Sequence, residues 1–467
     1  MTASATAFNR RTIRPSPARR IFSKIDTGQR SLKRLRPIVG GFPTEPPPLP
    51  THSTDSKRHI GTNHPTYRRN IRLQTATFPA GSAVMEPIEL TTGDGLVLRA
   101  WQAEDAEDVF RACQDPLIQR WAMVPVPYLY EHAVDFVGAG SQAGWAAGTA
   151  APLGVFDART GELLGSAGLV TLDLSHRHAE LGTWSAPWAR GRRVAERAGR
   201  AVAHWAFELL GLRRLVWRAE VGNHASRLTA ERIGFTFDGV VRAGLPSRNG
   251  GFVDGWHGVL LPGEVCDTPP AWVTPGGPGT LRARAFSHPP ERLPAGPGTL
   301  RQLRESDLID VVETFRDAES VAWTSIPLDY GPDRALAFIR HGYPDGWLRG
   351  TGAGFSMADA DDRFAGTIDL RISPVDPVTA EIGFTAAPWV RGKGYTTEAA
   401  RAICAFGFDK LALGRIVWRA HVGNAGSRRV AEKVGFVIEG VQRDGCEQRG
   451  ERLDGWVATL LAKDLVR

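Results

Sequence analysis

Residues 381–399, with the sequence EIGFTAAPWVRGKGYTTEA, decide how this chain is understood. The pattern predicts a strand over Ala380–Thr385, an interruption at Pro388, a glycine-rich turn, and an amphipathic helix from Thr396 to Leu411. A glycine-rich turn that enters a helix leaves several backbone N–H groups unpaired at the positive end of the helix dipole, which suits a pyrophosphate. We therefore expect an anion-binding loop here, with a plain turn as the alternative.

The same pattern occurs twice in the chain. Ala179–Val240 aligns without a gap on Ala380–Val441 at a constant offset of 201, and 30 of the 62 paired positions are identical. A period this long indicates a duplicated domain, because solenoid repeats recur every ~20–50 residues. We predict 85–262 as the first domain, 263–298 as a Pro/Gly-rich linker without helix or sheet, and 299–467 as the second domain.

Mixed strands and helices are expected within each copy. In the second copy the patterns predict strands over Leu300–Leu303, Phe364–Ile372 and Ile416–Val422, a helix through Val311 and Phe315 capped by Ser306 or Asp307, and a short helix over Ser427–Val434 closed by Gly435. This order predicts an α/β or α+β domain.

The net charge of +7 is unevenly spread. Residues 1–84 hold 15 Lys and Arg against 3 Asp and Glu, whereas the remainder holds 42 against 47. We expect residues 1–84 to be disordered, and we favour Met85 as the true start over an RNA- or ribosome-binding tail or a targeting segment. Nucleic acid is not expected to bind elsewhere.

The composition bounds the class of protein further. No apolar run is long enough to span a membrane. The four cysteines are scattered without metal-ligand spacing, so we expect no metal and a cytoplasmic location.

The second copy resembles the GNAT superfamily of acetyltransferases, whose coenzyme A loop follows [QR]-x-x-G-x-[GA]. It is most similar to the branch of ribosomal-protein alanine N-acetyltransferases, through Glu381–Phe384, Arg391–Ala399 and the stretch NAGSRRVAEKVGF at 424–436. Thr396 departs from the Ala or Gly usual there. The resemblance implies tandem domains, each with a mixed, mostly antiparallel sheet flanked by helices.

The resemblance also implies an activity. Acetyl-CoA would be the co-substrate, and its acetyl group would pass to a primary amine of a protein N-terminus or a small molecule in a ternary complex. The thioester would lie beside the strand that ends near Thr385, where members of the family splay two strands apart. The implied coenzyme contacts are Phe384, Thr385, Arg391, Gly392, Lys393, Gly394, Tyr395, Thr396, Asn424 and Ser427.

For proton transfer, the resemblance implies Ser427 as the acid that protonates the thiolate, and Glu447 as the base. Glu381 is the rival base, and its alternative is a carboxylate that holds neighbouring strands. Asn424 and Ser427 are alternatively helix-capping residues. Cys446 is interpreted as a bystander without a histidine partner.

Trp323 and Trp347 are either groove-lining or core residues.

The first copy is weaker. Its loop has Arg193 at the second glycine position, where glycine tolerates positive φ best, and it lacks an acidic residue over 240–253. We expect a degenerate copy that binds coenzyme weakly or not at all.

Two classes stay open for the whole chain: an acetyltransferase, or a non-catalytic tandem module that binds acyl-CoA or associates with ribosomes. It is expected as a monomer with paired domains or as a homodimer.

Overall fold

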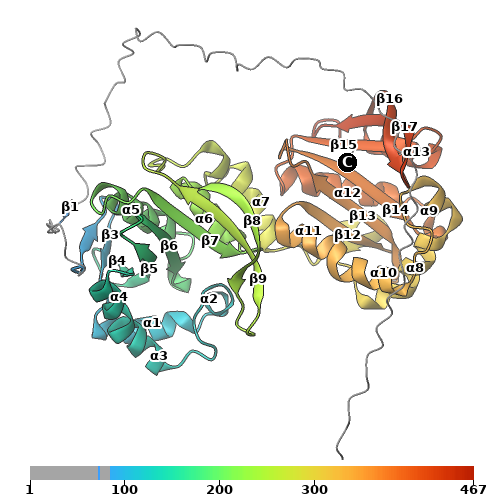
Figure 1. The fold of residues 1–467 in the computed structure, drawn as a ribbon. Helices are drawn as coiled ribbons and strands as arrows, with labels where there is room; N and C mark the ends of the chain where they lie inside the picture. Colours follow the sequence, from blue (N-terminus) through green and yellow to red (C-terminus); the bar gives the residue numbers. More distant parts are fainter. Residues whose placement is uncertain (1–71, 74–84, 467) are drawn as a thin grey trace, which may run out of the picture. The chain divides into compact units, whose positions relative to one another are not determined.

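The computed structural model describes residues 72–73 and 85–466. Within these residues the chain forms two sheets, each flanked by helices (Figure 1). The first sheet has the order β1-β2-β3-β4-β5-β6-β7-β9-β8. Its strands are β1 (Arg72–Leu73), β2 (Glu89–Thr91), β3 (Leu96–Arg99), β4 (Ala151–Asp157), β5 (Leu163–Asp173), β6 (His178–Ser185), β7 (Arg214–Glu220), β8 (Thr236–Pro246) and β9 (Phe252–Leu260).

The second sheet has the order β10-β11-β12-β13-β14-β15-β17-β16. Its strands are β10 (Arg292–Ala295), β11 (Gly298–Arg301), β12 (Gly352–Ala358), β13 (Phe364–Ile372), β14 (Thr379–Ala386), β15 (Arg415–His421), β16 (Val437–Gln448) and β17 (Glu451–Leu460). The β6–β7 and β14–β15 pairs are parallel and the remaining neighbours are antiparallel. The predicted fold class, two mixed and mostly antiparallel sheets flanked by helices, is confirmed.

Equivalent helices accompany the two sheets. The first set is α1 (Ala106–Cys113), α2 (Pro116–Trp121), α3 (Tyr130–Asp135), α4 (Ser141–Ala147), α5 (Val194–Glu208) and α6 (His224–Ile233). The second set is α8 (Leu308–Arg316), α9 (Ala318–Trp323), α10 (Pro332–Ala337), α11 (Tyr343–Arg349), α12 (Tyr395–Asp409) and α13 (Ala425–Val434).

Strand β13 separates a core face from a polar face. Ile368 and Leu370 are fully buried in the core that includes Ile403 of α12. Because side chains alternate along a strand, Thr367, Asp369 and Arg371 take the opposite face. The sheet therefore carries a hydrophobic core under α12 and a row of polar side chains on its other side.

The predicted strands and helices of the second copy are confirmed within two residues at each end that was predicted. The short helix α13 ends at Gly435 with φ 108°, as its sequence predicts. The predicted cap of α8 is wrong in its detail, because Asp307 gives that helix no side-chain cap. Its carboxylate instead accepts from the Arg304 backbone N–H and from Arg301 in a buried ion pair.

The prediction that 263–298 is free of helix and sheet is wrong. Helix α7 occupies Pro278–Ser287, and β10 also lies inside this segment, where it pairs with β11 at the segment's end. Pro278 stands at the first helical position, where its missing N–H costs nothing, so this proline starts a helix. Phe286 then belongs to the second core.

The prediction of disorder over 1–84 mostly lies outside the described residues. At Arg72–Leu73 it is wrong, since this pair forms β1 against Leu90 and Thr91 of β2, whose edge offers unpaired backbone groups. Met85, the favoured start, is buried in the first core.

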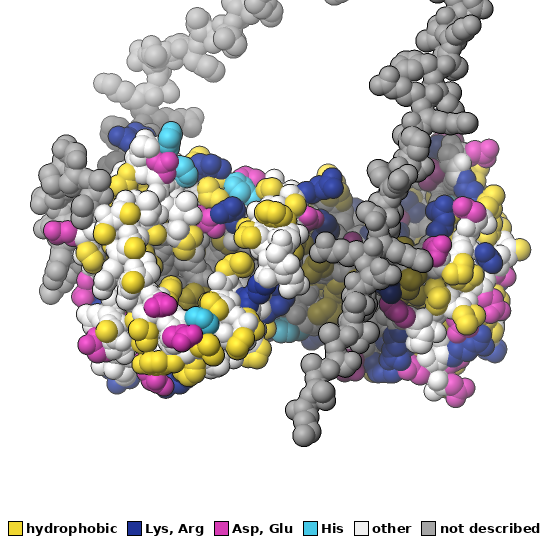
Figure 2. Space-filling model, turned by 60° about the horizontal axis from the view of Figure 1, so that its bottom comes forward, with side chains coloured by type: hydrophobic (Ala, Val, Ile, Leu, Met, Phe, Trp, Pro, Cys, Tyr) yellow, Lys and Arg dark blue, Asp and Glu magenta, His cyan; other side chains and the backbone are white. Residues whose placement is uncertain are grey.

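Across the described part of the chain, none of the helices has both the length and the apolar composition required to cross a bilayer. Figure 2 shows acidic and basic side chains interspersed over the face in view, as expected for a solvated surface.

Candidate active site

The parallel strands β14 and β15 open into a gap in the second sheet. They pair from Thr379 with Arg415 to Ile382 with Trp418, after which no further pair forms although both strands continue. The edge of β14 beyond Ile382 is therefore unpaired on that side. This is the splay that the resemblance predicts near Thr385.

A cavity of about 1630 Å³ contains this gap. Phe384 and Thr385 line it, as do Gly392, Gly394 and Thr396 of the glycine-rich turn. Asn424, Ser427, Glu381, Arg391, Cys446 and Glu447 line it as well. Lys393 and Tyr395 are absent from its lining, and the Tyr395 ring lies next to Gly298 of β11 instead.

The turn before α12 offers unpaired backbone amides. Within the described chain, the N–H groups of Gly392, Gly394, Tyr395 and Thr396 have no hydrogen-bond partner. Gly392 has φ 75° and Gly394 has φ 86°, a region that favours glycine. A Cβ added at either glycine would meet nothing within 4 Å, so the space beside these amides is open.

Arg391 is engaged with α9 rather than free at the turn. Its guanidinium donates to Glu319 at 3.0 Å and to the Ser320 hydroxyl at 2.9 Å, and it also pairs with Asp317. The first copy repeats this ion pair: Arg190 pairs with Asp115, the residue that caps α2 as Asp317 caps α9. The repetition assigns the arginine to the fold of the turn. Lys393 is exposed and makes no ion pair to any residue in the described ranges.

Asn424, Ser427 and Trp418 form a small hydrogen-bonded group. The Asn424 side chain accepts from the Ser427 backbone N–H at 3.0 Å, which is the capping role considered from sequence. The Trp418 indole N–H donates to Ser427 Oγ at 3.1 Å. The hydroxyl proton of Ser427 therefore stays available for a group in the cavity.

The two glutamates considered as bases have different surroundings. Glu381 accepts from Arg371 at 2.9 Å and also pairs with Arg419, so it joins strands β13, β14 and β15. Glu447 is exposed on β16 and accepts from the N–H of Gly450 in its own hairpin. The alternative of a strand-holding carboxylate describes Glu381.

The structure also places the two tryptophans and the cysteine that were considered from the sequence. Trp347 is buried and donates to the Gly354 carbonyl, so it is a core residue, whereas Trp323 lines the cavity beside Gly423. Burial raises the pKa of the Cys446 thiol. A thiol kept protonated is a poor nucleophile, which agrees with its interpretation as a bystander.

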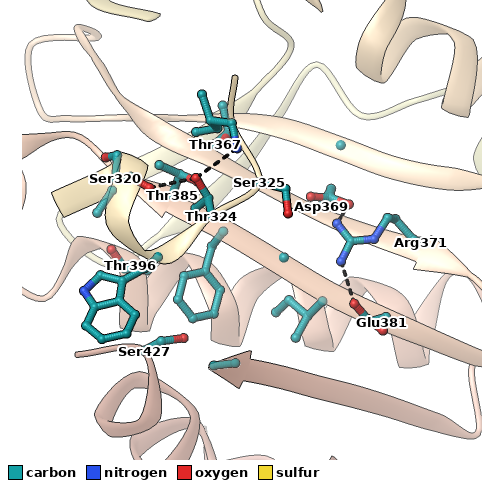
Figure 3. A pocket seen from close by; sticks show the side chains of 18 of the residues that line it. Ser320, Thr324, Ser325, Thr367, Asp369, Arg371, Glu381, Thr385, Thr396 and Ser427 are labelled. Carbon is teal, nitrogen blue, oxygen red and sulfur yellow. Dashed lines mark hydrogen bonds and ion pairs between the residues drawn. The ribbon is translucent and has the colours of Figure 1, made fainter. Parts of the chain in front are cut away.

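A polar cluster that the sequence interpretation missed lies on the other wall of the cavity. Asp369 accepts from Arg371 at 3.0 Å, and the Tyr343 hydroxyl lies 3.4 Å from Asp369. Figure 3 shows Asp369, Arg371 and Glu381 together on one side of the cavity, with Thr396 and Ser427 on the other. The period-two row of Thr367, Asp369 and Arg371 in a correctly predicted strand was the available signal.

Burial raises the pKa of Asp369 to about 6, because desolvation of the carboxylate outweighs the opposing effects of Arg371 and the Tyr343 hydroxyl. The pKa of Tyr343 is raised well above its ordinary value, first by burial and then by the Asp369 charge. Tyr343 is therefore a hydrogen-bond donor at all ordinary pH values.

A family model described as "Acetyltransferase (GNAT) domain" matches residues 95–236 and again 299–437, together more than half of the chain. The chain belongs to the GNAT acetyltransferase family.

Individual relatives match only parts of the chain. "Putative ribosomal N-acetyltransferase YdaF" of Bacillus subtilis is 40% identical over 85 residues, 18% of this chain and 46% of that protein. "Probable N-acetyltransferase YjcK" of the same organism is 38% identical over 106 residues, 22% of this chain and 59% of that protein. The chain thus spans about half the length of these curated relatives.

Among solved structures, Mycobacterium smegmatis RimJ in complex with CoA-disulfide is 22% identical, with a TM-score of 0.34 over 38% of this chain and 87% of that one.

The first GNAT copy has the same splay but different side chains. Strands β6 and β7 pair only from His178 to Glu180, and the Ser226 hydroxyl accepts from Trp217 as in the second copy. At the turn, however, Arg193 replaces Gly394 with φ 55°. The prediction of a side chain held at positive φ is confirmed.

A buried carboxylate accompanies this arginine. Glu196, only 2% exposed, stands in the first turn of α5 where the second GNAT copy has Thr397. It accepts from Arg193 at 2.8 Å and from Arg200 at 3.0 Å, and Arg232 lies 3.8 Å away. Burial acts to raise the pKa of Glu196, but the hydrogen bonds from Arg193 and Arg200 leave it lowered. The first copy thus carries its own anion at the turn.

Proposed function

We propose that the second GNAT copy transfers the acetyl group of acetyl-CoA to a primary amine, at a protein N-terminus or on a small molecule, by direct attack in a ternary complex. The carrying observation is that one cavity joins three features: the unpaired amides before α12, the opened edge of β14 and the hydroxyl of Ser427. The scattered cysteines suit action in a reducing cytoplasm.

The turn fits a diphosphate. Several unpaired N–H groups point from the start of a 15-residue helix, where its dipole favours an anion. The open space at Gly392 and Gly394 lets phosphate oxygens approach the backbone. In this proposal Lys393 adds charge at the rim, while Arg391 and Tyr395 hold the turn in place and contribute little through their side chains.

The gap between β14 and β15 would receive the thioester arm. Backbone groups near Phe384 and Thr385, freed from strand pairing, would hydrogen-bond the arm and polarise the thioester carbonyl. Ser427 would then donate its proton to the departing thiolate, with Asn424 and Trp418 fixing its position.

A carboxylate that is neutralised by two cations is a poor proton acceptor. Glu381 is held by two arginines, so in this proposal it supports the sheet. We retain Glu447 as an acceptor at the solvent-exposed end of the cavity, where a proton can leave to water.

The first copy is proposed not to bind the coenzyme. Its loop amides are also unpaired, so the difference lies in the side chains. The Glu196 carboxylate already occupies the turn, is paired with Arg193 and Arg200, and would repel a diphosphate.

The test compares two matched variants of the full chain. Gly394→Glu places a carboxylate at the second-copy turn, and Arg193→Glu places it at the same position of the first. Arg193 shows that this position tolerates a side chain. Because Arg193→Glu also removes a cation from the buried Glu196, circular dichroism first checks that both variants are folded. We expect Gly394→Glu to weaken acetyl-CoA binding at least ~10-fold by calorimetry, and to lose amine-dependent thiol release. Arg193→Glu should do neither.

Acetyl-CoA binding without thiol release for any amine would favour a non-catalytic coenzyme-binding module. Loss of acetyl-CoA binding in Arg193→Glu alone would show that the coenzyme binds to the first copy and would contradict the proposal.

A further inference from the structure

The carboxylate of Asp369 lines the cavity, and its negative charge is less fully neutralised by cations than that of Glu381. Arg371 is shared between Asp369 and Glu381, and Glu381 has a second cation in Arg419. The Asp369 side chain is only 14% exposed, so water compensates it poorly. A buried carboxylate in this position gains from a further cation.

The surroundings of Asp369 leave room on the cavity side. Its partners across the sheet are Gly354 on β12 and Gly383 on β14. A Cβ at Gly383 would come within 3.1 Å of the Asp369 carboxylate and 2.6 Å of Arg371, and one at Gly354 would collide with the Tyr343 ring. Both glycines therefore make space for the cluster of Tyr343, Asp369 and Arg371.

Comparison of the two copies shows that the fold does not need this cluster. Strand pairing places Gly168 opposite Gly182 where Asp369 faces Gly383, and Thr171 opposite Glu180 where Arg371 faces Glu381. Ser141 begins α4 where Tyr343 begins α11. All three members of the cluster are thus replaced in the copy whose coenzyme turn is altered.

The first copy nevertheless keeps the strand-joining pair, Glu180 with Arg218, as well as the hydrogen bond from Trp217 to Ser226. The repeated Glu–Arg pair therefore serves the common fold. Among the charged side chains on this wall of the cavity, Asp369 and Arg371 occur only in the copy that has the glycine turn, so we associate them with the reaction of that copy.

We infer that Asp369 is the amine-binding residue of the second copy: its carboxylate receives the acceptor as an ammonium ion and takes one proton from it. This inference rests on the proposed acetyltransferase function. The Tyr343 hydroxyl and the Arg371 guanidinium hold the carboxylate, leaving its remaining lone pairs toward the cavity.

The position agrees with the reaction geometry. Asp369 is two residues along β13 from Thr367, which pairs with Thr385 at the splay. Two residues of a strand span ~7 Å. An ammonium group on Asp369 thus lies on the substrate face of the sheet, a short distance from the expected thioester carbonyl.

The step balances. The ammonium gives one proton to the Asp369 carboxylate, and the neutral nitrogen forms a C–N bond to the thioester carbonyl carbon. The C–S bond then breaks, and the second proton of the nitrogen ends on the coenzyme sulfur through Ser427. Asp369 is the first acceptor, and its proton then leaves to water at the exposed end of the cavity, where Glu447 is the outer acceptor. A carboxyl with a pKa of about 6 is ionised and ready to accept at neutral pH.

The titratable and charged groups that act on Asp369 come from three elements: Arg371 on its own strand, Tyr343 from α11, and Glu381 from β14. Strand β12 contributes only Gly354 opposite it. Below pH 6 the carboxyl is protonated and cannot bind an ammonium ion, so kcat/KM for the amine should fall on the acid side.

The experiment compares wild type, Asp369→Asn and the control Asp361→Asn, an exposed residue between β12 and β13. Amine-dependent thiol release and acetylated product are measured from pH 5 to 9, and acetyl-CoA affinity is measured by calorimetry. We expect Asp369→Asn to lose at least ~100-fold in kcat/KM for the amine. Its acetyl-CoA affinity should be unchanged, which also reports that it has folded, and its acid limb should be absent.

A second variant tests the same carboxyl without removing it. Tyr343→Phe deletes a hydrogen bond that lowers the pKa of Asp369, so the acid limb should move to higher pH. Wild-type activity retained in Asp369→Asn, or an unmoved limb in Tyr343→Phe, would overturn the assignment alone. A wild type that acetylates no amine would overturn the proposed function and the assignment together.

Discussion

Replacing Asp369 should stabilise the protein at neutral pH. Its carboxyl has a pKa of about 6 in the folded chain against an ordinary value of 3.8. Because folding raises this pKa, the folded state binds the proton more tightly than the unfolded state. The contribution of this carboxyl to stability is therefore greatest below pH ~4, falls as the pH rises from ~4 to ~6, and is lost above that range.

The magnitude follows from the same two values. At ~1.36 kcal/mol per pH unit, the ionised carboxylate costs the folded state ~3 kcal/mol above pH 6. Asn at this position removes that cost, which already includes the attraction to Arg371. Its amide N–H2, however, replaces the oxygen that accepts from the Tyr343 hydroxyl, a loss of ~1–2 kcal/mol. Arg371 keeps Glu381 as a partner. The net gain for Asp369→Asn at pH 8 is thus ~1–2 kcal/mol.

Differential scanning calorimetry from pH 4 to pH 8 measures this effect. The transition of the second domain is identified as the one that acetyl-CoA raises, because a ligand stabilises the domain that binds it. A gain of ~1–2 kcal/mol corresponds to a rise in Tm of ~2–8 °C at pH 8, and the rise should vanish near pH 4. If Asp369→Asn melts at a lower temperature than wild type at pH 8, the carboxylate supports the fold and the reasoning is refuted.

Three further outcomes are expected. Ser427→Ala should lower kcat ~100-fold with little change in KM, whereas Ser226→Ala in the first copy should leave thiol release unchanged; equal losses would assign the serine to folding alone. Replacing Arg193 by Gly together with Glu196 by Thr should raise the calorimetric stoichiometry of acetyl-CoA from one to two per chain, and a ratio that stays at one would show that more than the turn has diverged. Glu381→Gln should lower the free energy of unfolding by ~1 kcal/mol or less, because the ion pairs of Glu381 are partly exposed. It should leave kcat within a few-fold of wild type. A loss of ~100-fold or more in kcat would instead indicate that Glu381 is the base.

The sequence was sufficient for the strand, turn and helix around Gly394, because local chemistry alone specifies them. Glycine at positive φ, a proline before the turn and an apolar stripe each act within a few residues. The duplication carried these features to the first copy, including the strained position of Arg193. Where only local signals mattered, prediction and structure agree.

The features that the sequence did not predict depend on tertiary contacts. The Pro/Gly-rich composition of 263–298 predicted a linker without helix, although Pro278 at the first helical position starts a helix once Phe286 has a core to enter. Arg391 was expected at the coenzyme, but the segment around α9, more than 70 residues earlier in the chain, supplies acidic partners. Asp369 was overlooked because its significance depends on Tyr343 and Glu381, which only the folded sheet brings beside it.

The internal anion of the first copy has a consequence for how the chain survives in a cell. If the proposed function is right, the first copy, whose arginines are matched by Glu196, keeps its stability at any supply of acetyl-CoA, whereas the second copy gains stability only when acetyl-CoA is abundant. Starvation for acetyl donors should therefore expose the C-terminal half to proteases first, leaving an N-terminal fragment as the trace of low supply.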